Sequence, residues 1–286
     1  MNVSPIRGGW AAVFTLLLLS ILTTLAIGED APTPAPKPTP PPGPAAYLQR
    51  AKYITVAKCK MCHKPVFTAW DTTLHAKANK QLPWEADAAN TKVPPAETVY
   101  RYTTGYNAET KTWSEKGTTC EACHGPGSEH FTATKDQRKA LITDPAKLQT
   151  TGQKVSICGR CHGQYVVGDQ RFAAKFQVGQ DLLTTDGFKL DKPVPGKPMQ
   201  EMNELVGSKH FKHDIVCLDC HTAHATPALE HALKKPVIEL CTSCHKNIAM
   251  ATHAPKAPAT ATCATCHMPK GAHTFTKPDD ENGHDD

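Results

Sequence analysis

The chain has few aromatic residues and no long amphipathic segment, and both shortages argue against a large conventional hydrophobic core. Aromatic residues make up 6% and apolar residues 40% of its 286 positions. Proline and glycine together reach about 15%, which is above average but below the range of collagen or low-complexity chains. Lysine and arginine give a net charge of +5, but they are scattered, so no basic patch indicates binding to nucleic acid.

No cysteine lies outside six copies of one five-residue motif, Cys-x-x-Cys-His. With 12 Cys and 15 His in the chain, chance predicts about 0.03 copies of this signature of c-type haem attachment. On a helical turn, residues i and i+3 share a face, so both thiols reach the vinyl groups of one haem and the histidine points at the iron. The attachment cysteines are Cys59, Cys62, Cys120, Cys123, Cys158, Cys161, Cys217, Cys220, Cys241, Cys244, Cys263 and Cys266. The proximal histidines are His63, His124, His162, His221, His245 and His267.

Other roles for these cysteines leave the histidines unexplained. Disulfides do not require a histidine after every second cysteine, and a zinc site made of four thiolates does not require one either. Redox-active cysteine pairs do not come in sixes. The sequence therefore predicts six covalently bound haem c groups.

Each of six irons needs a second axial ligand, and nine histidines lie outside the motifs. Met61 lies inside a motif and Met268 directly follows one, so neither methionine is well placed to serve as a ligand. Two histidines on every iron are therefore expected. The candidate distal ligands are His75, His130, His210, His224, His253 and His273.

Local spacing indicates how these histidines are used. His130, His224 and His273 follow their own motifs too closely to return to the same iron, so each is expected to reach a neighbouring haem. His210 and His213 compete for one role before the fourth motif, and His210 is favoured. His231 and His284 are expected to be surface residues.

The termini predict an exported protein. Residues 1–28 contain an uncharged apolar run behind Arg7 and end in Ala26-Ile27-Gly28, which fits a signal peptide or an N-terminal membrane anchor. A lipoprotein anchor is not expected, because no cysteine lies near the end of this run. Residues 29–46 hold eight prolines and predict a semi-rigid linker, and residues 277–286 predict an acidic disordered tail. The localisation expected is periplasmic, at the outer surface or extracellular, with a tether to the inner membrane if the anchor is retained.

Residues 47–276 are expected to form one hexahaem cytochrome c domain. The 240 residues from Tyr47 onward leave 40 for each motif, so the haems themselves are expected to be the core. The fold class predicted is mainly loops with short α-helices, a multihaem cytochrome c fold with little or no β-sheet. Short helices are expected near 94–102 and 136–148, and a brief strand at Tyr165–Val167.

Four segments, CKMCHKPVFTAWDTTLH, CEACHGPGSEH, SKHFKHDIVCLDCHTAH and CATCHMPKGAH, resemble the tetrahaem cytochrome c family that works beside hydroxylamine oxidation. They are also similar to its larger relatives, among them outer-surface multihaem cytochromes of metal-reducing bacteria. The resemblance spans about residues 53–275, except for an insert at 164–206. It implies electron transfer through closely packed haem pairs, and distal ligation by His75, His130, His224 and His273. The six motifs, instead of four, mean that individual ligand pairings cannot be carried over.

The sequence therefore favours an electron-transfer protein without a substrate, rather than an enzyme. Its partners would be redox proteins, either other cytochromes or quinol-linked reductases, with membrane contact only through an N-terminal anchor. One alternative is a multihaem reductase of a small nitrogen or sulfur oxyanion, which needs one iron with an open position. Another is a self-assembling subunit of a conductive cytochrome filament.

Overall fold

The structure is a computed structural model that describes residues 46–78, 82, 96–171, 176–224 and 229–276. The predicted signal or anchor segment, nearly all of the proline-rich linker and the acidic tail lie outside the described residues. Within the described part of the chain, no helix combines the length and the apolar character needed to cross a bilayer.

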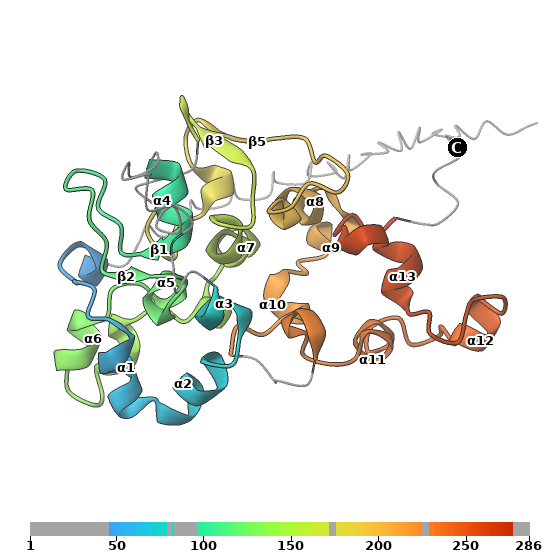
Figure 1. Ribbon diagram of the computed structural model, residues 1–286, viewed down its shortest axis with the longest axis horizontal. Coiled ribbons are helices and arrows are strands. Elements are labelled where there is room, and N and C mark those ends of the chain that lie inside the picture. The colour runs from blue at the N-terminus through green and yellow to red at the C-terminus, as the bar shows by residue number, and fades with distance from the viewer. Residues whose placement is uncertain (1–45, 79–81, 83–95, 172–175, 225–228, 277–286) are drawn as a thin grey trace, which may run out of the picture. The chain divides into compact units, whose positions relative to one another are not determined.

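Short helices joined by loops make up most of the described chain (Figure 1). The α-helices are α1 Val56–Cys62, α2 Lys64–Trp70, α3 Leu74–Lys77, α4 Ala96–Tyr102, α5 Cys120–His124, α6 Ser128–Thr132, α7 Thr151–Gly159, α8 Glu201–Gly207, α9 Lys209–Lys212, α10 Cys217–Cys220, α11 Val237–Thr242, α12 Met250–His253 and α13 Cys263–His267. The 3₁₀ helices are η1 Ala46–Gln49, η3 Arg138–Leu141, η4 Pro145–Lys147, η5 Leu182–Thr184, η6 Glu230–Ala232 and η7 Pro269–Gly271. The predicted fold class, loops with short helices, is confirmed.

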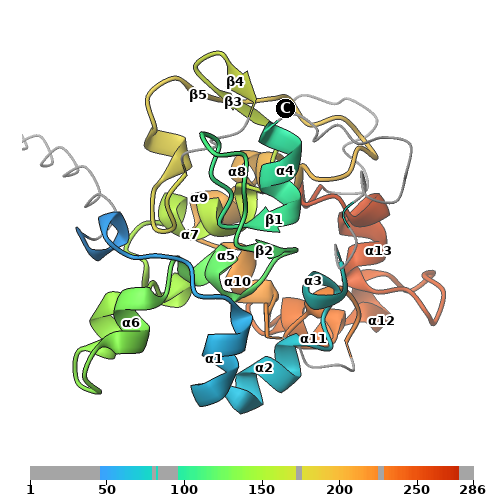
Figure 2. The ribbon, with the colours of Figure 1, turned by 60° about the vertical axis from the view of Figure 1, so that its left-hand side comes forward.

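The strands form two small antiparallel sheets. They are β1 Thr103–Thr104, β2 Glu115–Lys116, β3 Tyr165–Val167, β4 Gln170–Arg171 and β5 Phe188–Leu190. β1 pairs with β2, and the second sheet has the order β4-β3-β5. Figures 1 and 2 show the second sheet near the upper edge of the view, above α4 and α7. The strand predicted at Tyr165–Val167 is confirmed and is the central strand of this sheet.

One predicted helix takes a different form. The segment 136–148 contains two 3₁₀ turns, η3 and η4, instead of an α-helix. Pro145 explains the break, because proline lacks a backbone N–H and biases the preceding residue toward extended backbone. Asp144 is extended (φ −103°, ψ 105°), and its carboxylate accepts a hydrogen bond from the Ala146 N–H. The other predicted helix, 94–102, is present as α4 from Ala96 onward, and its first two residues lie outside the described chain.

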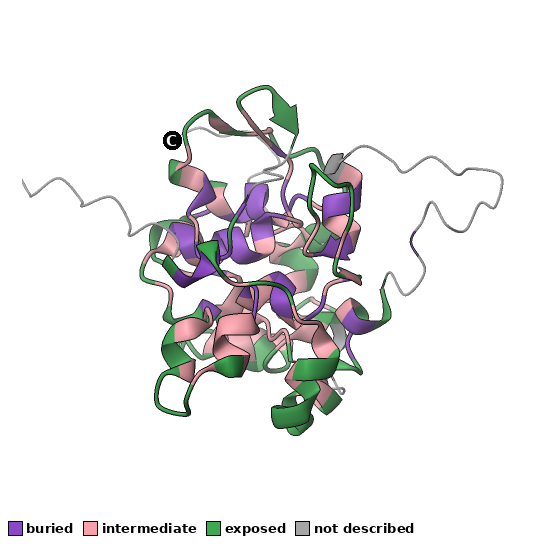
Figure 3. Ribbon diagram, turned by 90° about the vertical axis from the view of Figure 1, so that its left-hand side faces the viewer, coloured by how far each residue is buried: buried purple, intermediate pink, exposed green. Residues whose placement is uncertain are grey.

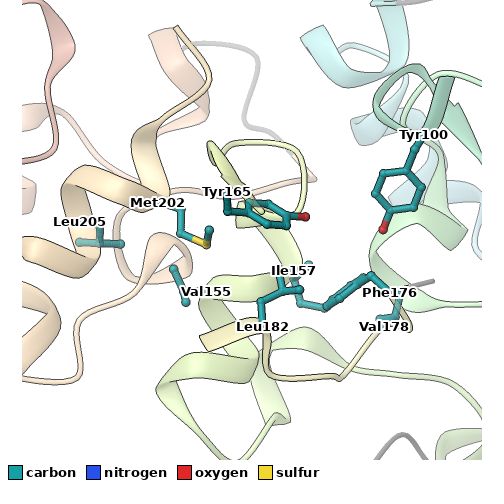
Figure 4. Close-up of a cluster of buried hydrophobic side chains, with 9 residues drawn as sticks. All are labelled: Tyr100, Val155, Ile157, Tyr165, Phe176, Val178, Leu182, Met202 and Leu205. Carbon is teal, nitrogen blue, oxygen red and sulfur yellow. The ribbon is translucent and has the colours of Figure 1, made fainter. Parts of the chain in front are cut away.

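A side-chain core exists in addition to the six motifs. It brings together side chains from α4, α7, α8, β3 and η5 and from the loop between β4 and η5. Its buried members are Tyr100, Val155, Ile157, Tyr165, Phe176, Val178, Leu182, Met202 and Leu205 (Figure 4). Each such side chain stabilises the fold by about 1.5–3 kcal/mol. The insert at 164–206, which the sequence comparison with the tetrahaem family left unexplained, supplies most of this core.

Burial is uneven along the chain. α1 and α2 contain no buried residue, whereas α7 and α8 contain several. Figure 3 shows the buried segments in the middle and upper part of the domain and mostly exposed helices at the bottom. The first two helices are therefore held by a few specific contacts rather than by a large apolar interface.

The strongest of these contacts is a buried carboxylate, Glu121 of α5, which is 1% exposed. It accepts hydrogen bonds from the backbone N–H groups of Ile54 (3.0 Å), Thr55 (2.9 Å) and Gly127 (2.8 Å). Burial raises the pKa of Glu121, while these N–H donors act in the opposite direction. The side chain thereby fixes the loop that starts α1 against the turn that follows α5.

Replacing Glu121 with glutamine is expected to lower the free energy of unfolding by about 2 kcal/mol, because an amide nitrogen would face backbone donors that need an acceptor. Denaturant unfolding of the full-length protein measures this loss. The matched control is Glu129→Gln, which removes a partly exposed ion pair with Arg50 (3.5 Å) and is expected to change stability by less than about 1 kcal/mol. Equal losses in the two variants would contradict the proposed role of Glu121.

Candidate haem-binding site

Each Cys-x-x-Cys-His motif begins within a short helix. The six motif helices are α1, α5, α7, α10, α11 and α13. All twelve cysteines are free thiols, and each is partly or fully exposed. These thiols stand in the positions of the thioether sulfurs that covalent haem attachment would create, and Cys123 and Cys217 also pack against the side-chain core.

Successive motif helices pack in pairs. α1 contacts α5, α7 contacts α10, and α11 contacts α13. Within each pair one thiol of the first motif lies close enough to one thiol of the next motif for the two groups to interact. The three interacting pairs are Cys59 with Cys120, Cys158 with Cys217, and Cys241 with Cys263.

The pairs are also linked to one another. Cys123 of the second motif lies close enough to Cys161 of the third for the two thiols to interact electrostatically, and the same holds for Cys220 of the fourth motif and Cys244 of the fifth. Figure 1 shows the six motif helices following one another across the view in sequence order. Neighbouring attachment sites in space are therefore neighbouring motifs in the chain.

Every motif histidine faces one histidine from outside the motifs, with the two ring centres 5.9–6.1 Å apart. Three of these partners, His130, His224 and His273, each follow a different motif from the one whose histidine they face. The six pairs are His63 with His130, His124 with His224, His162 with His75, His221 with His273, His245 with His210, and His267 with His253.

The separation of the rings fits a metal ion between them. Two imidazoles on opposite sides of one metal, each bound through a ring nitrogen at about 2 Å, have their ring centres about 6 Å apart. Rings stacked directly against each other would lie closer than this, and rings without a shared partner would have no common spacing. The twelve paired histidines and twelve thiols together therefore fit six haem groups.

Hydrogen bonds orient four of the paired rings. The Nδ1 atoms of His124, His130, His221 and His267 lie 2.8–2.9 Å from the backbone carbonyl oxygens of Thr143, Arg138, His231 and Thr276. A carbonyl oxygen can only accept a hydrogen bond, so Nδ1 carries the proton in each ring. The Nε2 lone pair is then free to bind a metal ion, which is the usual arrangement for metal-binding histidines.

Two further rings face carboxylates of α8. The Nδ1 atom of His162 lies 3.3 Å from a carboxylate oxygen of Glu201. The Nδ1 atom of His273 lies 3.9 Å from a carboxylate oxygen of Glu204. Although burial acts in the opposite direction, the hydrogen bond with His162 lowers the pKa of Glu201, which keeps this side chain anionic.

Burial lowers the pKa of His75, His124, His210 and His221, and the facing ring of each pair lowers it further. These imidazoles are therefore neutral near pH 7. Neutral imidazole is the form that binds a metal ion.

The remaining histidines are placed differently. Among the described ring contacts, His213 and His231 do not face a motif histidine, and His284 lies outside the described residues. Sequence reasoning missed Glu201 and Glu204, because two glutamates three residues apart carry no motif and their contacts depend on the packing of α8.

Comparisons with known proteins place this arrangement in a family. A family model described as outer membrane cytochrome MtrC/MtrF-like, domains II/IV, matches residues 44–194, and a model of a doubled CXXCH motif matches residues 210–250. The multiheme cytochrome MtrA of Shewanella baltica (strain OS185) is 30% identical over 132 residues, which is 45% of this chain and 27% of that protein. The match therefore spans only about a quarter of this curated relative.

Two solved structures are also similar. The outer cell wall cytochrome OcwA has a TM-score of 0.48 and 17% identity, with 78% of this chain and 79% of that chain covered. The undecaheme cytochrome from the S-layer of Carboxydothermus ferrireducens has a TM-score of 0.44 and 19% identity, with 84% and 53% covered.

The predicted resemblance to outer-surface multihaem cytochromes is thus confirmed, whereas the narrower likeness to the tetrahaem family associated with hydroxylamine oxidation stays a prediction. Because the first family model covers more than half of the chain, the protein belongs to the MtrC/MtrF-like outer membrane cytochromes and is a multihaem c-type cytochrome.

Proposed function

We propose that the protein is an electron-transfer cytochrome with six covalently attached haem c groups, each held between two histidines. The observation that carries this proposal is the set of six histidine pairs, because every pair contains one motif histidine and all separations fall within 5.9–6.1 Å. The six partners are His75, His130, His210, His224, His253 and His273.

Bound haem c supplies a one-electron iron(III)/iron(II) couple. With haem c bound, the two histidines of each pair would both hold its iron and would leave no position for a substrate. This arrangement supports transfer of electrons between partners and disfavours the alternative of an oxyanion reductase, which requires an open iron. The chain's task is then to fix the spacing of the cofactors and to set their potentials through ligands, hydrogen bonds and burial.

The contacts between motifs support a relay in sequence order. The thiol contacts from Cys59 to Cys120, from Cys158 to Cys217 and from Cys241 to Cys263 join motifs one to two, three to four and five to six. Electrostatic interactions between the thiols of motifs two and three and of motifs four and five connect these pairs. We infer that electrons enter at one end of this series and leave at the other.

The cell envelope or its outer surface is the location that fits these features. The apolar run in residues 1–28 would direct export, either as a cleaved signal or as an anchor, and the family is described as outer membrane cytochromes. Partners would then be other cytochromes or quinol-linked reductases on the donor side.

Replacing His210 with alanine is expected to convert one of six haems from low spin to high spin, because the iron bound to His245 would lose its second imidazole. EPR spectra of the oxidised holoprotein measure the change. His213→Ala is the matched control, since His213 lies three residues away and is expected to leave all six signals unchanged. The opposite result would exchange the roles of the two histidines.

The fully reduced holoprotein is expected to donate one electron from each haem to a soluble iron(III) complex. It is expected to show no steady-state reduction of nitrite or sulfite. Stopped-flow absorption measures the first reaction, and product analysis measures the second. Sustained turnover of either oxyanion would contradict the electron-transfer proposal and would support the reductase alternative.

Replacing His253 with methionine is expected to raise the potential of the sixth haem, because a thioether ligand favours iron(II) relative to imidazole. The sixth haem would then be reduced before the fifth in the titration, and its added electron would lower the potential of the fifth haem by charge repulsion. The potential of the first haem would stay unchanged. A redox titration followed by EPR tests this order. A larger shift of the first haem than of the fifth would contradict a relay in sequence order.

A further inference from the structure

The helix α8 places two carboxylates against two paired histidines. Glu201 and Glu204 are three residues apart and therefore share one face of the helix. A carboxylate oxygen of Glu201 lies 3.3 Å from Nδ1 of His162, and both side chains are 39% exposed. A carboxylate oxygen of Glu204 lies 3.9 Å from Nδ1 of His273. The same oxygen accepts a hydrogen bond from the backbone N–H of His273 at 2.8 Å.

These two contacts differ in charge from the others that the structure describes. The Nδ1 atoms of His124, His130, His221 and His267 each face a neutral backbone carbonyl oxygen. Only at His162 and His273, among these oriented rings, does the facing group carry a formal negative charge. His162 is the histidine of the third motif, and His273 is the partner of His221 in the fourth motif. The two charged contacts therefore fall on the histidine pairs of the third and fourth motifs.

α8 is held rigidly enough to keep this geometry. The Met202 N–H donates to the carbonyl oxygen of His162 at 2.9 Å, and the Gln164 N–H donates to the side chain of Asn203 at 2.8 Å. Met202 and Leu205 of the same helix are buried in the side-chain core at 1% and 4% exposure. These two side chains anchor α8 in the core while the glutamates contact the histidines.

We propose, on the basis of the function proposed above, that Glu201 and Glu204 are positioning residues that lower the reduction potentials of the third and fourth haems. Glu201 accepts the Nδ1 proton of His162, which makes this imidazole a more basic ligand and stabilises iron(III) relative to iron(II). Glu204 lies too far from Nδ1 of His273 for a hydrogen bond and acts through its charge. A fixed negative charge beside the ligand also opposes the arrival of an electron at the iron.

Both carboxylates act on the same place in the relay. The third and fourth motifs are in contact through α7 and α10, and the thiols of Cys158 and Cys217 lie close enough to interact. The central pair of haems is therefore the most difficult to reduce. In a partly reduced protein the electrons occupy the first, second, fifth and sixth haems, and the central pair limits their exchange.

The test is a redox titration of the holoprotein carrying Glu201→Gln, followed by EPR. The low-spin signal that disappears in a His75→Ala variant identifies the third haem. Its reduction equilibrium is expected to shift toward iron(II) by about tenfold, which is ~59 mV for a one-electron couple. Glu201→Asp keeps the charge and is expected to keep the potential of the third haem close to the wild-type value. Glu204→Gln is expected to act in the same direction on the fourth haem.

The matched control is Glu239→Gln, which removes the same charge from α11, where Glu239 pairs with Lys235 at 2.9 Å. This variant is expected to leave the third haem unchanged. If Glu201→Gln and Glu239→Gln behave alike while both proteins hold six low-spin haems, the inference is wrong and the proposed function stands. If the wild-type protein itself has fewer than six low-spin haems, the proposed function fails and this inference fails with it.

Discussion

The pairing of each motif histidine with a histidine from another segment is the contact on which the arrangement of the chain depends. His124 and His224 come from positions far apart in the sequence, yet their rings are parallel within 5° and 5.9 Å apart. Similar pairs join α3 to the third motif and the segment after α13 to the fourth motif. An iron bound by both rings of a pair links two segments as a disulfide would, so six such links would hold together a chain that has few apolar residues and short helices.

The link also explains why burial is so uneven. α1 and α2 bury no side chain, and they are connected to the rest by Glu121 and by the pairs that His63 and His75 form. The side-chain core around α7 and α8 is the part of the domain that packs without help from a cofactor. α8 joins the side-chain core to the histidine pairs, because Met202 and Leu205 belong to the core while Glu201 and Glu204 face the histidines.

Much of this could be predicted from the sequence. The motif spacing predicts the attachment residues. The position of His130, three residues after a turn that contains Gly125 and Gly127, predicted a partner other than His124, and its ring faces His63. The choice of His210 over His213 followed from local context alone. These predictions depend on short-range geometry, which a helical turn or a tight loop determines within a few residues.

Other features depend on contacts between distant segments and had no signal in the sequence. The core formed by the insert was missed because its apolar residues are spread over loops and short strands rather than over a periodic helix. By contrast, the 3₁₀ turns in residues 136–148 do have a local signal, because Pro145 disfavours one continuous helix. The carboxylates of α8 could not be assigned, since their neighbours His162 and His273 lie about 40 and 70 residues away along the chain.

The measurement that tests the central claim most directly is the haem content of the purified holoprotein together with its EPR spectrum in the oxidised state. The proposed arrangement predicts six haems for each chain, all low spin, with no signal from an iron that has an open position. Fewer than six haems, or a high-spin signal equivalent to about one haem in six, would contradict the pairing of all twelve histidines.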